Sequence, residues 1–343
     1  MDFSSSASKA HEPGIFSAYT LARDFNVHAT KASPGFEQLS ELDLTKKSQD
    51  LSAVAKRLLN PAVSGRAKGK EVIRTRKAGV WSPFEMNPQK LERFLREGRG
   101  MGSGNAYRPW IQVNDFSSLG RVHRTSSALT GYRTHHLLSD NEYYAYLEAW
   151  WDEEMLDIRE QYPLLPVALT CGIAAELGFR HPYSTKYRLA IPLTTDLLLV
   201  RKRGLEAVAV VEDAHYEEQR TEEKLAIAEE FWRRRGVPTR VALSSTLKVQ
   251  RSRNLHWIYQ ARRAPTERPY APGANPLHDC LVGQVEGGPM SFWELAFRAD
   301  LALCLPMGTS IAAIRWLLAE RVLSTDIDDG DITKDCEIFV RSK

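Results

Sequence analysis

The chain has 343 residues, of which 43% are hydrophobic and 26% charged. This apolar share excludes a disordered protein, and the length favours about two domains. No apolar run reaches the ~18 residues of a membrane span, and the first residues lack the pattern of a secretory signal. The cysteines are far apart and form no CxxC motif, which argues against zinc or a disulfide framework and favours a reducing cytoplasm. They are Cys171, Cys280, Cys304 and Cys336.

Positive charge is concentrated in one segment near the N-terminus. The net charge is only +3, but residues 56–99 hold twelve Lys or Arg against four Glu. A basic arm on a mildly acidic body is typical of proteins that bind a phosphate backbone, although a solvated linker has the same composition. If the protein binds DNA, we expect phosphate contacts in and near this arm. The expected residues are Arg74, Arg76, Lys77, Arg99, Arg121 and Arg124.

The middle of the chain alternates between predicted strands and helices. In chain order we expect a helix at 89–99, strands at 109–116 and 120–127, a hairpin partner at 128–138 reached through Thr130-Gly131, a helix at 139–154, an extended segment at 155–166, a helix at 170–179, strands at 188–204 and 205–214, a helix at 220–236 and a strand at 239–245. Ser139 is a natural N-cap for the strongest of these helices. The order favours a compact α/β domain with a central mixed sheet.

Prolines mark a boundary before the C-terminal part of the chain. Pro265, Pro269, Pro272 and Pro276 fall between residues 264 and 277, a density typical of a linker. Two helices and a hairpin turning at Asp329-Gly330 are expected beyond it, which is the pattern of a winged-helix module. We therefore expect a basic, partly disordered extension at 1–85, an α/β domain at 86–244 and a helical, winged-helix-like domain at 245–343.

Two acidic residues are the strongest candidates for chemistry. Asp196 stands in the apolar strand PLTTDLLLV, where its carboxylate needs a cation or hydrogen bonds to stay charged. Glu142 lies in the first turn of the helix at 139–154. If the two meet at a sheet edge, they form an oxygen-ligand site suited to Mg²⁺. Simpler interpretations stay open, because Ser139-x-x-Glu142 is also a capping box and Asp196 could be satisfied by backbone donors.

Two other motifs are weaker candidates for a metal site. His135 and His136 are neighbours in a predicted strand, so their side chains point to opposite faces and do not form a joint metal site. Residues 326–330 look like part of a calcium loop but lack its full spacing and terminal Glu, and we interpret them as the hairpin turn.

A long, ordered series of motifs between residues 89 and 262 resembles the TnsA-type transposon-end endonucleases. The motifs are GRG, PW, SS-x-GR-x-HR, HHLLSD-x-E, LDIREQYPLLP, TTD, RTEEKLAIAEEFW and NLHWIY. The resemblance continues more weakly through the helical tail to about residue 327. The segment at 1–85 is longer than the usual N-terminus of the family.

The resemblance implies a specific fold, cofactor and set of partners. It implies a restriction-endonuclease-like (PD-(D/E)XK-type) sheet flanked by helices, and one or two Mg²⁺ ions held by Glu142 and Asp196. It implies that the protein cuts the 5′ ends of a transposon in double-stranded DNA. A TnsB-like DDE transposase would cut the 3′ ends, and a TnsC-like AAA+ ATPase would contact the C-terminal domain. The setting would be the bacterial cytoplasm, without a membrane.

One position departs from the family. The strand after the aspartate carries Gln-x-Lys in the family, and the most economical register places Val210 at the Gln and Glu212 at the Lys. Such a lysine orients or activates the attacking water and offsets phosphate charge. Replacing this lysine with Glu changes the local charge by two units. The electrostatic energy of each unit with a neighbouring charge is roughly 3 kcal/mol at ~5 Å and an effective dielectric of ~20. Lys224 or Lys202 could replace the cation, and Glu212 could become a third metal ligand.

Two functions therefore stay open at the level of the sequence. The first is an active Mg²⁺-dependent endonuclease subunit of a heteromeric transposase, with Glu142 and Asp196 as its central groups. The second is a degenerate subunit that binds DNA and partners without cutting, so that transposition by 3′-end cleavage alone gives cointegrates. A third reading, a free-standing winged-helix regulator, leaves the long motif series unexplained.

Overall fold

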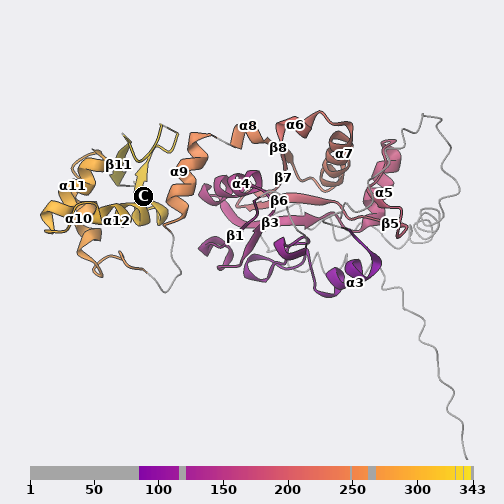
Figure 1. The fold of residues 1–343 in the computed structure, drawn as a ribbon, viewed down its shortest axis with the longest axis horizontal. Helices are drawn as coiled ribbons and strands as arrows, with labels where there is room; N and C mark the ends of the chain where they lie inside the picture. Colours follow the sequence, from indigo (N-terminus) through magenta and orange to yellow (C-terminus); the bar gives the residue numbers. More distant parts are fainter. Residues whose placement is uncertain are drawn as a thin grey trace, which may run out of the picture.

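The computed structural model describes residues 85–115, 121–247, 249–261, 268–328, 330–334 and 336–340 (Figure 1). The predictions for residues 1–84, including DNA contacts by Arg74, Arg76 and Lys77, lie outside the described residues, as does Pro265. No helix in the described ranges combines the length and the apolar character that crossing a membrane requires.

A four-stranded mixed sheet lies at the centre of the α/β part of the molecule (Figure 1). Its strands are β3 (Met155–Pro163), β6 (Thr194–Arg201), β7 (Gly204–Val211) and β8 (Thr239–Leu243), in the spatial order β3-β6-β7-β8. Neighbours among the first three are antiparallel, whereas β8 is parallel to β7. The mixed sheet predicted from the sequence is confirmed.

The two faces of the sheet carry separate apolar cores, because successive side chains of a strand point to opposite faces. Leu197 belongs to a core shared with α4 (Asp140–Trp151). Leu198, the next residue of β6, belongs to a core shared with α5 (Val167–Glu176) and α7 (Gln219–Arg233). Helices therefore cover both faces, as an apolar strand such as β6 requires.

The predicted helix and hairpin before the sheet are also present. The helix is α3 (Pro88–Arg96), which Asn87 caps by accepting from the Lys90 N–H at 2.7 Å. The hairpin pairs β1 (His123–Thr125) with β2 (His135–Leu137) and returns through a 3₁₀ turn, η5 (Ala128–Thr130). Gly131 ends this turn at φ +61°, a left-handed conformation that glycine adopts without strain.

Residues 109–116 were predicted as a strand, and this prediction is wrong. The described part of the segment is a loop that ends in a 3₁₀ turn, η4 (Val113–Asp115). Trp110 is fully buried against Phe94 with ring centroids 5.3 Å apart, and its backbone N–H donates to the Gln161 carbonyl at 3.2 Å. Asp115 turns the chain by accepting from the Gln112 N–H at 2.8 Å. The apolar residue at 110 thus reflects a single anchor rather than one face of a strand.

Shorter elements complete this part of the chain. They are η3 (Gly104–Ala106), the two-stranded ribbon β4 (Tyr183–Ser184) and β5 (Leu189–Ala190), α6 (Asp213–Tyr216) and α8 (Ser244–Leu247). The strand predicted at 188–204 is thereby divided into β5 and β6.

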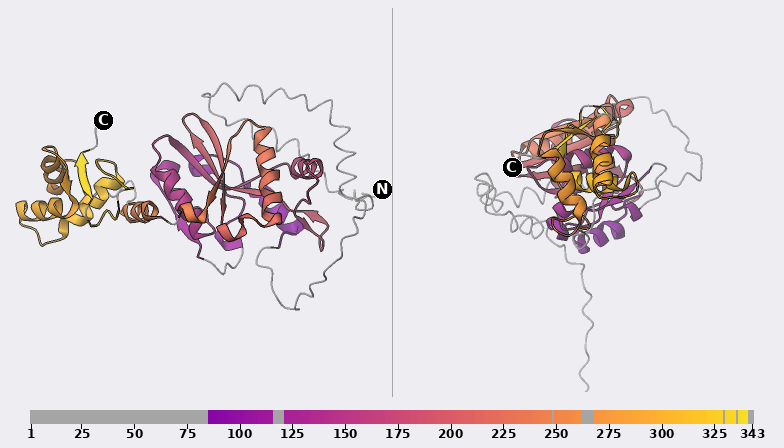
Figure 2. Two further views of the ribbon diagram at one scale, coloured as in Figure 1. Left: turned by 90° about the horizontal axis from the view of Figure 1, so that it is seen from above. Right: turned by 90° about the vertical axis from the view of Figure 1, so that its left-hand side faces the viewer.

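The C-terminal part forms a separate group of elements at one end of the molecule (Figure 2). Its helices are α9 (Gln250–Tyr259), α10 (Pro276–Val285), α11 (Phe292–Ala302) and α12 (Thr309–Ala319), and its small sheet has the order β10-β11-β9, formed by Leu323–Thr325, Glu337–Val340 and Met290–Ser291. The two predicted helices and an antiparallel pair of strands, β10 and β11, are confirmed, while Asp329 of the predicted turn lies outside the described residues. Helices α9 and α10 were not expected. Pro276 is the first residue of α10 rather than part of a linker, because proline suits the first turn of a helix.

Helix α9 connects the two parts. The Tyr259 hydroxyl lies 2.6 Å from Thr125 Oγ1 and 3.2 Å from the Tyr146 hydroxyl of α4. Tyr259 also donates to the Ser126 carbonyl at 2.9 Å. These buried polar contacts tie the C-terminal elements to the helix whose first turn carries Glu142.

Candidate functional site

Glu142 is placed by the N-terminus of α4. The Ser139 hydroxyl caps the helix by accepting from the Glu142 N–H at 3.1 Å. The Glu142 carboxylate reaches back and accepts from the Leu138 N–H at 3.0 Å, one residue before the position that a regular capping box would use. The capping interpretation therefore holds for Ser139. Glu142 itself is only 8% exposed and still has carboxylate lone pairs beyond this bond.

Asp196 lies near the start of β6, where β6 and β7 separate. Its Oδ2 atom accepts from the Val210 N–H of β7 at 2.7 Å. The Val210 N–H is thus the backbone donor that the simpler interpretation of Asp196 required. It occupies Oδ2, whereas Oδ1 accepts from the side chain of Gln161.

Gln161 brings the two carboxylates together. Its Nε2 atom donates to Glu142 Oε2 at 3.1 Å and to Asp196 Oδ1 at 3.3 Å. The two oxygens therefore lie no more than about 6.4 Å apart, since both are within reach of one nitrogen. Thr194 fixes the amide by donating to Gln161 Oε1 at 3.1 Å. The helix start and the strand thus converge as the sequence predicted.

Sequence reasoning missed Gln161 as a site residue. It is 3% exposed and has φ +49° within β3, a backbone conformation that costs energy for a residue with a side chain. A signal was available, because Gln161 belongs to the motif LDIREQYPLLP. That motif, however, carries several polar residues, and only the fold shows which of them faces the carboxylates.

The electrostatics of the pair favour the binding of a cation. Burial raises the pKa of Glu142, and the neighbouring charge of Asp196 raises it further. Burial also raises the pKa of Asp196, while the bonds from Val210 and Gln161 and the charge of Lys224 lower it. Two buried carboxylates that resist ionisation together become stable as anions when a cation joins them.

The donor set fits a magnesium ion. Mg²⁺ binds hard oxygen ligands, and in nucleic-acid enzymes it commonly uses one or two carboxylates together with water and substrate phosphate. Glu142 and Asp196 supply two such carboxylates. Within the ranges that the structure describes, no three Asp, Glu, His or Cys side chains are arranged to hold a metal ion. Glu142 and Asp196 are therefore the candidate protein ligands, and ligation by Glu212 stays a prediction.

Glu212 lies next to the pair rather than within it. It precedes α6, and its carboxylate accepts from the side-chain amide of Asn141, the residue before Glu142. Lys224 is exposed on α7, and its charge reaches Asp196. Lys202 lies in the turn at the other end of β6, six residues from Asp196 and so about 20 Å along the strand. Of the two substitute lysines suggested by the sequence, only Lys224 is near the site.

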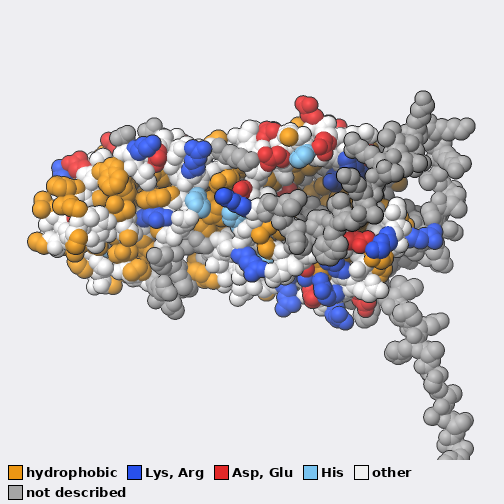
Figure 3. Space-filling model, viewed as in Figure 1, with side chains coloured by type: hydrophobic (Ala, Val, Ile, Leu, Met, Phe, Trp, Pro, Cys, Tyr) orange, Lys and Arg blue, Asp and Glu red, His pale blue; other side chains and the backbone are white. Residues whose placement is uncertain are grey.

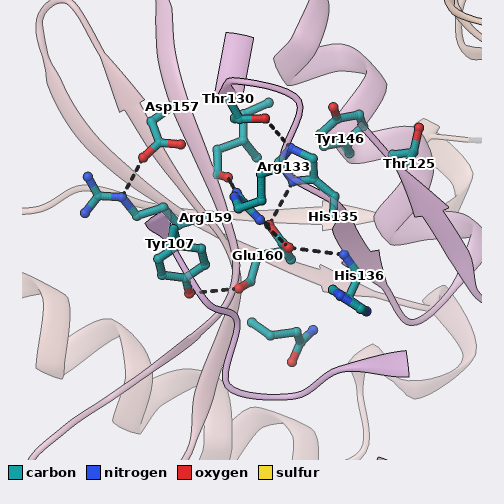
Figure 4. A network of polar contacts seen from close by, with 12 residues as sticks. Tyr107, Thr125, Thr130, Arg133, His135, His136, Tyr146, Asp157, Arg159 and Glu160 are labelled. Atoms are coloured by element: carbon teal, nitrogen blue, oxygen red, sulfur yellow. Dashed lines mark hydrogen bonds and ion pairs between the residues drawn. The ribbon is translucent and has the colours of Figure 1, made fainter. Parts of the chain in front are cut away.

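A buried ion cluster lies beside the site (Figure 4). Glu160, which precedes Gln161 in β3, is fully buried and accepts from Arg133 Nη1 at 2.6 and 2.9 Å. His135 Nδ1 lies 2.9 Å from Glu160, and the His136 N–H donates to it at 3.1 Å. Burial alone would raise the pKa of Glu160, but His135 and Arg133 outweigh it and hold the pKa at about 2. His135 is thus an interior residue, and it does not form a metal site with His136.

The predicted DNA-contacting arginines divide into two groups. Arg121 and Arg124 are exposed, and the Arg124 guanidinium donates to the Asn114 side chain. Arg99 is only 6% exposed, and its guanidinium is paired with Glu97 and Asp115. Arg99 therefore supports the loop at 110–115, and we do not retain it as a direct phosphate contact.

Comparisons with known proteins identify the family. Residues 152–243 match the model of the TnsA-like endonuclease N-terminal domain. The transposition protein TnsA of transposon Tn7 from Escherichia coli is 32% identical over 241 residues, which is 69% of this chain and 86% of that protein. The chain belongs to the TnsA family of endonucleases. The restriction-endonuclease-like fold expected from the motifs agrees with the mixed sheet and its flanking helices.

The region of the family-model match contains all four strands of the central sheet of this TnsA-family protein. It includes Gln161, Asp196 and Glu212, while Glu142 lies just before it. The longer match to Tn7 TnsA supports a transposition endonuclease subunit as the general role of the chain.

Proposed function

We propose that this TnsA-family protein is the Mg²⁺-dependent endonuclease subunit of a heteromeric cut-and-paste transposase. It would cut the 5′ ends of its transposon in the cytoplasm beside a DDE transposase that cuts the 3′ ends. The observation that carries the proposal is that the Gln161 side-chain nitrogen donates hydrogen bonds to both Glu142 and Asp196. Such a pair of buried carboxylates has a clear use as a divalent-cation site.

The residues of the chain have separable roles in this mechanism. Glu142 and Asp196 would hold the ion, with the Leu138 and Val210 N–H groups keeping their carboxylates in place. A bound Mg²⁺ would polarise the scissile phosphate and lower the pKa of the attacking water. Lys224 would provide the positive charge that the family places at the position of Glu212, and so offset the phosphate.

The alternative is a degenerate subunit that binds DNA and partners without cutting. It is favoured by Glu212, which the register expected from the sequence aligns with the family lysine. The Glu212 carboxylate contacts Asn141, next to the proposed ligand Glu142. Reconstitution of the transposase on a plasmid carrying the transposon ends distinguishes the two. An active nuclease releases the element by double-strand cleavage in Mg²⁺, whereas a degenerate one leaves 3′ nicks and cointegrates.

Lys224→Met tests the replacement of the family lysine. We expect 5′-end cleavage to slow about 100-fold, because a single preorganised cation or donor at the reacting phosphate contributes this much. Binding of Mn²⁺ in the absence of DNA should change little. Lys202→Met is the matched control, since Lys202 is an exposed lysine at the far end of β6. An equal loss of 5′-end cleavage in both variants, or no loss in Lys224→Met, would contradict the proposed role of Lys224.

Gln161→Met tests the bridge between the carboxylates. Hydrogen bonds that orient ligating carboxylates typically contribute 10- to 100-fold to metal affinity or activity, so we expect Mn²⁺ affinity to fall by about that factor. Thr194→Val, which removes only the hydroxyl that fixes the amide, should cause a smaller loss in the same direction. Calorimetric titration with Mn²⁺ and thermal unfolding measured without metal separate the effect from general destabilisation. Wild-type affinity in Gln161→Met would refute the bridge.

The C-terminal part offers a surface for the AAA+ regulator that the family resemblance implies. Trp293, Phe297 and Leu301 recur every four residues on α11 and are 52%, 54% and 61% exposed. An apolar stripe of this kind on a helix is typical of a partner contact. We propose that it docks the TnsC-like ATPase, and that the helices and small sheet around it are winged-helix-like. Phe297→Asp should abolish co-purification with the ATPase but leave Mn²⁺ binding unchanged.

A further inference from the structure

A polar groove runs between α3 and the loop at 112–115. Its larger part is a solvent-open hollow of about 790 Å³, and a second hollow of about 290 Å³ adjoins it. Glu97, Arg99 and Gln112 line both hollows, so the two are neighbours. We call this feature the α3 groove.

The α3 groove has an excess of positive charge. Its lining contains Lys90, Arg93, Arg96, Arg99 and Arg108, against the acidic residues Glu97 and Asp115. Lys90, Arg93 and Arg96 are spaced three apart on α3, which puts them along one side of the helix. Lys and Arg side chains gather along the lower edge of the molecule in Figure 3, where α3 lies in Figure 1.

The two acidic residues are mostly engaged by one arginine. Arg99 lies 2.7 Å from Glu97 and 2.5 Å from Asp115, whereas Arg93 is 3.6 and 3.7 Å from the same carboxylates. Burial lowers the pKa of Lys90; Asp115 opposes this, and the charges of Arg93 and Arg99 add to it. The cations therefore crowd one another, and an entering anion would relieve their repulsion.

The α3 groove is connected to the carboxylate pair through Trp110 and Gln161. Arg99 Nη1 donates to the Trp110 carbonyl at 3.0 Å, and the backbone N–H of Trp110 donates to the Gln161 carbonyl at 3.2 Å. Gln161 in turn bridges Glu142 and Asp196. At the other side of the groove, Asn114 accepts from Arg124, one of the arginines predicted to contact DNA.

We propose that the α3 groove binds the sugar–phosphate backbone of the DNA duplex that is cut at the Glu142–Asp196 site. The proposal rests on the proposed nuclease function. Arg93 and Arg96 would contact phosphates directly, and Arg99 would hold the groove wall in place. Such contacts position a duplex without reading its sequence. DNA is favoured over an acidic protein segment because the groove is linked to the groups that would act on a phosphodiester.

The double variant Arg93→Ala/Arg96→Ala tests this proposal in the full-length protein. Both side chains are exposed, and neither belongs to the metal site. Binding to a short duplex should weaken roughly tenfold or more at low salt, equally for transposon-end and unrelated sequences. The slope of log K against log salt should fall by about 1.8, since each phosphate contact contributes about 0.9. Arg203→Ala/Arg233→Ala removes two arginines that are 84% and 70% exposed elsewhere and is the control.

Each outcome is informative. Unchanged affinity and salt slope in Arg93→Ala/Arg96→Ala would overturn the groove assignment. Normal DNA binding combined with loss of assembly with the other transposase subunits would assign the groove to an acidic protein partner, and would also overturn it. Absence of DNA binding by the wild-type protein would instead refute the nuclease proposal itself. Unaltered Mn²⁺ binding in the variant confirms that the fold and the carboxylate pair are intact.

Discussion

Asp196→Asn is expected to reduce 5′-end cleavage by the reconstituted transposase about 1000-fold or more, with DNA binding retained. The substitution preserves the shape of the side chain but removes one of two anionic ligands. Charge stabilisation by a bound metal is worth several kcal/mol, and each 1.36 kcal/mol is tenfold in rate. Glu142→Gln should give a loss of the same order. Gel assays that label the 5′ and 3′ cleavage products separately measure the effect.

The control is Glu229→Gln, which changes an exposed carboxylate on α7. It should cut at the wild-type rate. Mn²⁺ titration adds a readout independent of cleavage, because both site variants should lose binding in the absence of DNA. If Asp196→Asn produced the same 5′ ends as the wild type, the Glu142–Asp196 pair would not be the active site. If cleavage were lost while metal binding persisted, Asp196 would act on the substrate rather than on the ion.

Removing one member of the buried Glu160–Arg133 pair is expected to have the largest effect on stability. Arg133 also donates to the Ile158 carbonyl at 2.6 Å and to the Gly104 carbonyl at 2.9 Å. Arg133→Met would leave the buried Glu160 carboxylate with His135 as its remaining side-chain partner. Breaking a buried ion pair in this way costs about 3–5 kcal/mol. Urea unfolding of both proteins at neutral pH measures the difference.

The same pair predicts an acid transition. The pKa of Glu160 is about 2 in the folded protein, below its ordinary value of 4.5. The stabilisation is therefore fully present above about pH 4.5 and is lost as the pH falls toward 2. In Glu160→Gln the acid dependence between these values should become flatter. Arg233→Met, which breaks an exposed pair with Glu230, should change neither stability nor its pH dependence measurably. A similar small effect of Arg133→Met would show that the cluster does not support the fold.

Local patterns in the sequence predicted the elements that carry the site. Ser139 caps α4 as expected, and the apolar run after Asp196 forms a central strand with a core on each face. Apolar alternation, caps and glycine turns depend on neighbouring residues, so they can be recognised in the sequence alone. The segment at 109–116 was wrongly predicted as a strand, because a single buried apolar side chain, Trp110, resembles the buried face of a short strand.

The contacts that organise the site join residues distant in the chain. Gln161 lies 19 residues from Glu142 and 35 from Asp196. No periodicity marks it, and its left-handed φ is imposed by the fold around it. The same holds for Arg99, which the sequence placed in a basic arm and the fold places against Glu97 and Asp115. Whether a charged side chain meets solvent or another charge depends on what packs beside it.

By itself, the sequence determined the order of most helices and strands, the kinship to the TnsA family and the choice of Glu142 and Asp196 as the carboxylates proposed to hold a metal ion. Only the tertiary structure decided that one amide nitrogen joins those carboxylates, that Lys224 rather than Lys202 is near them, and that α3 lines a cationic groove. The reason is physical. Helix caps and strand alternation are short-range consequences of backbone geometry, whereas a site of this kind forms only when the folded sheet brings together side chains from β3, β6 and α4.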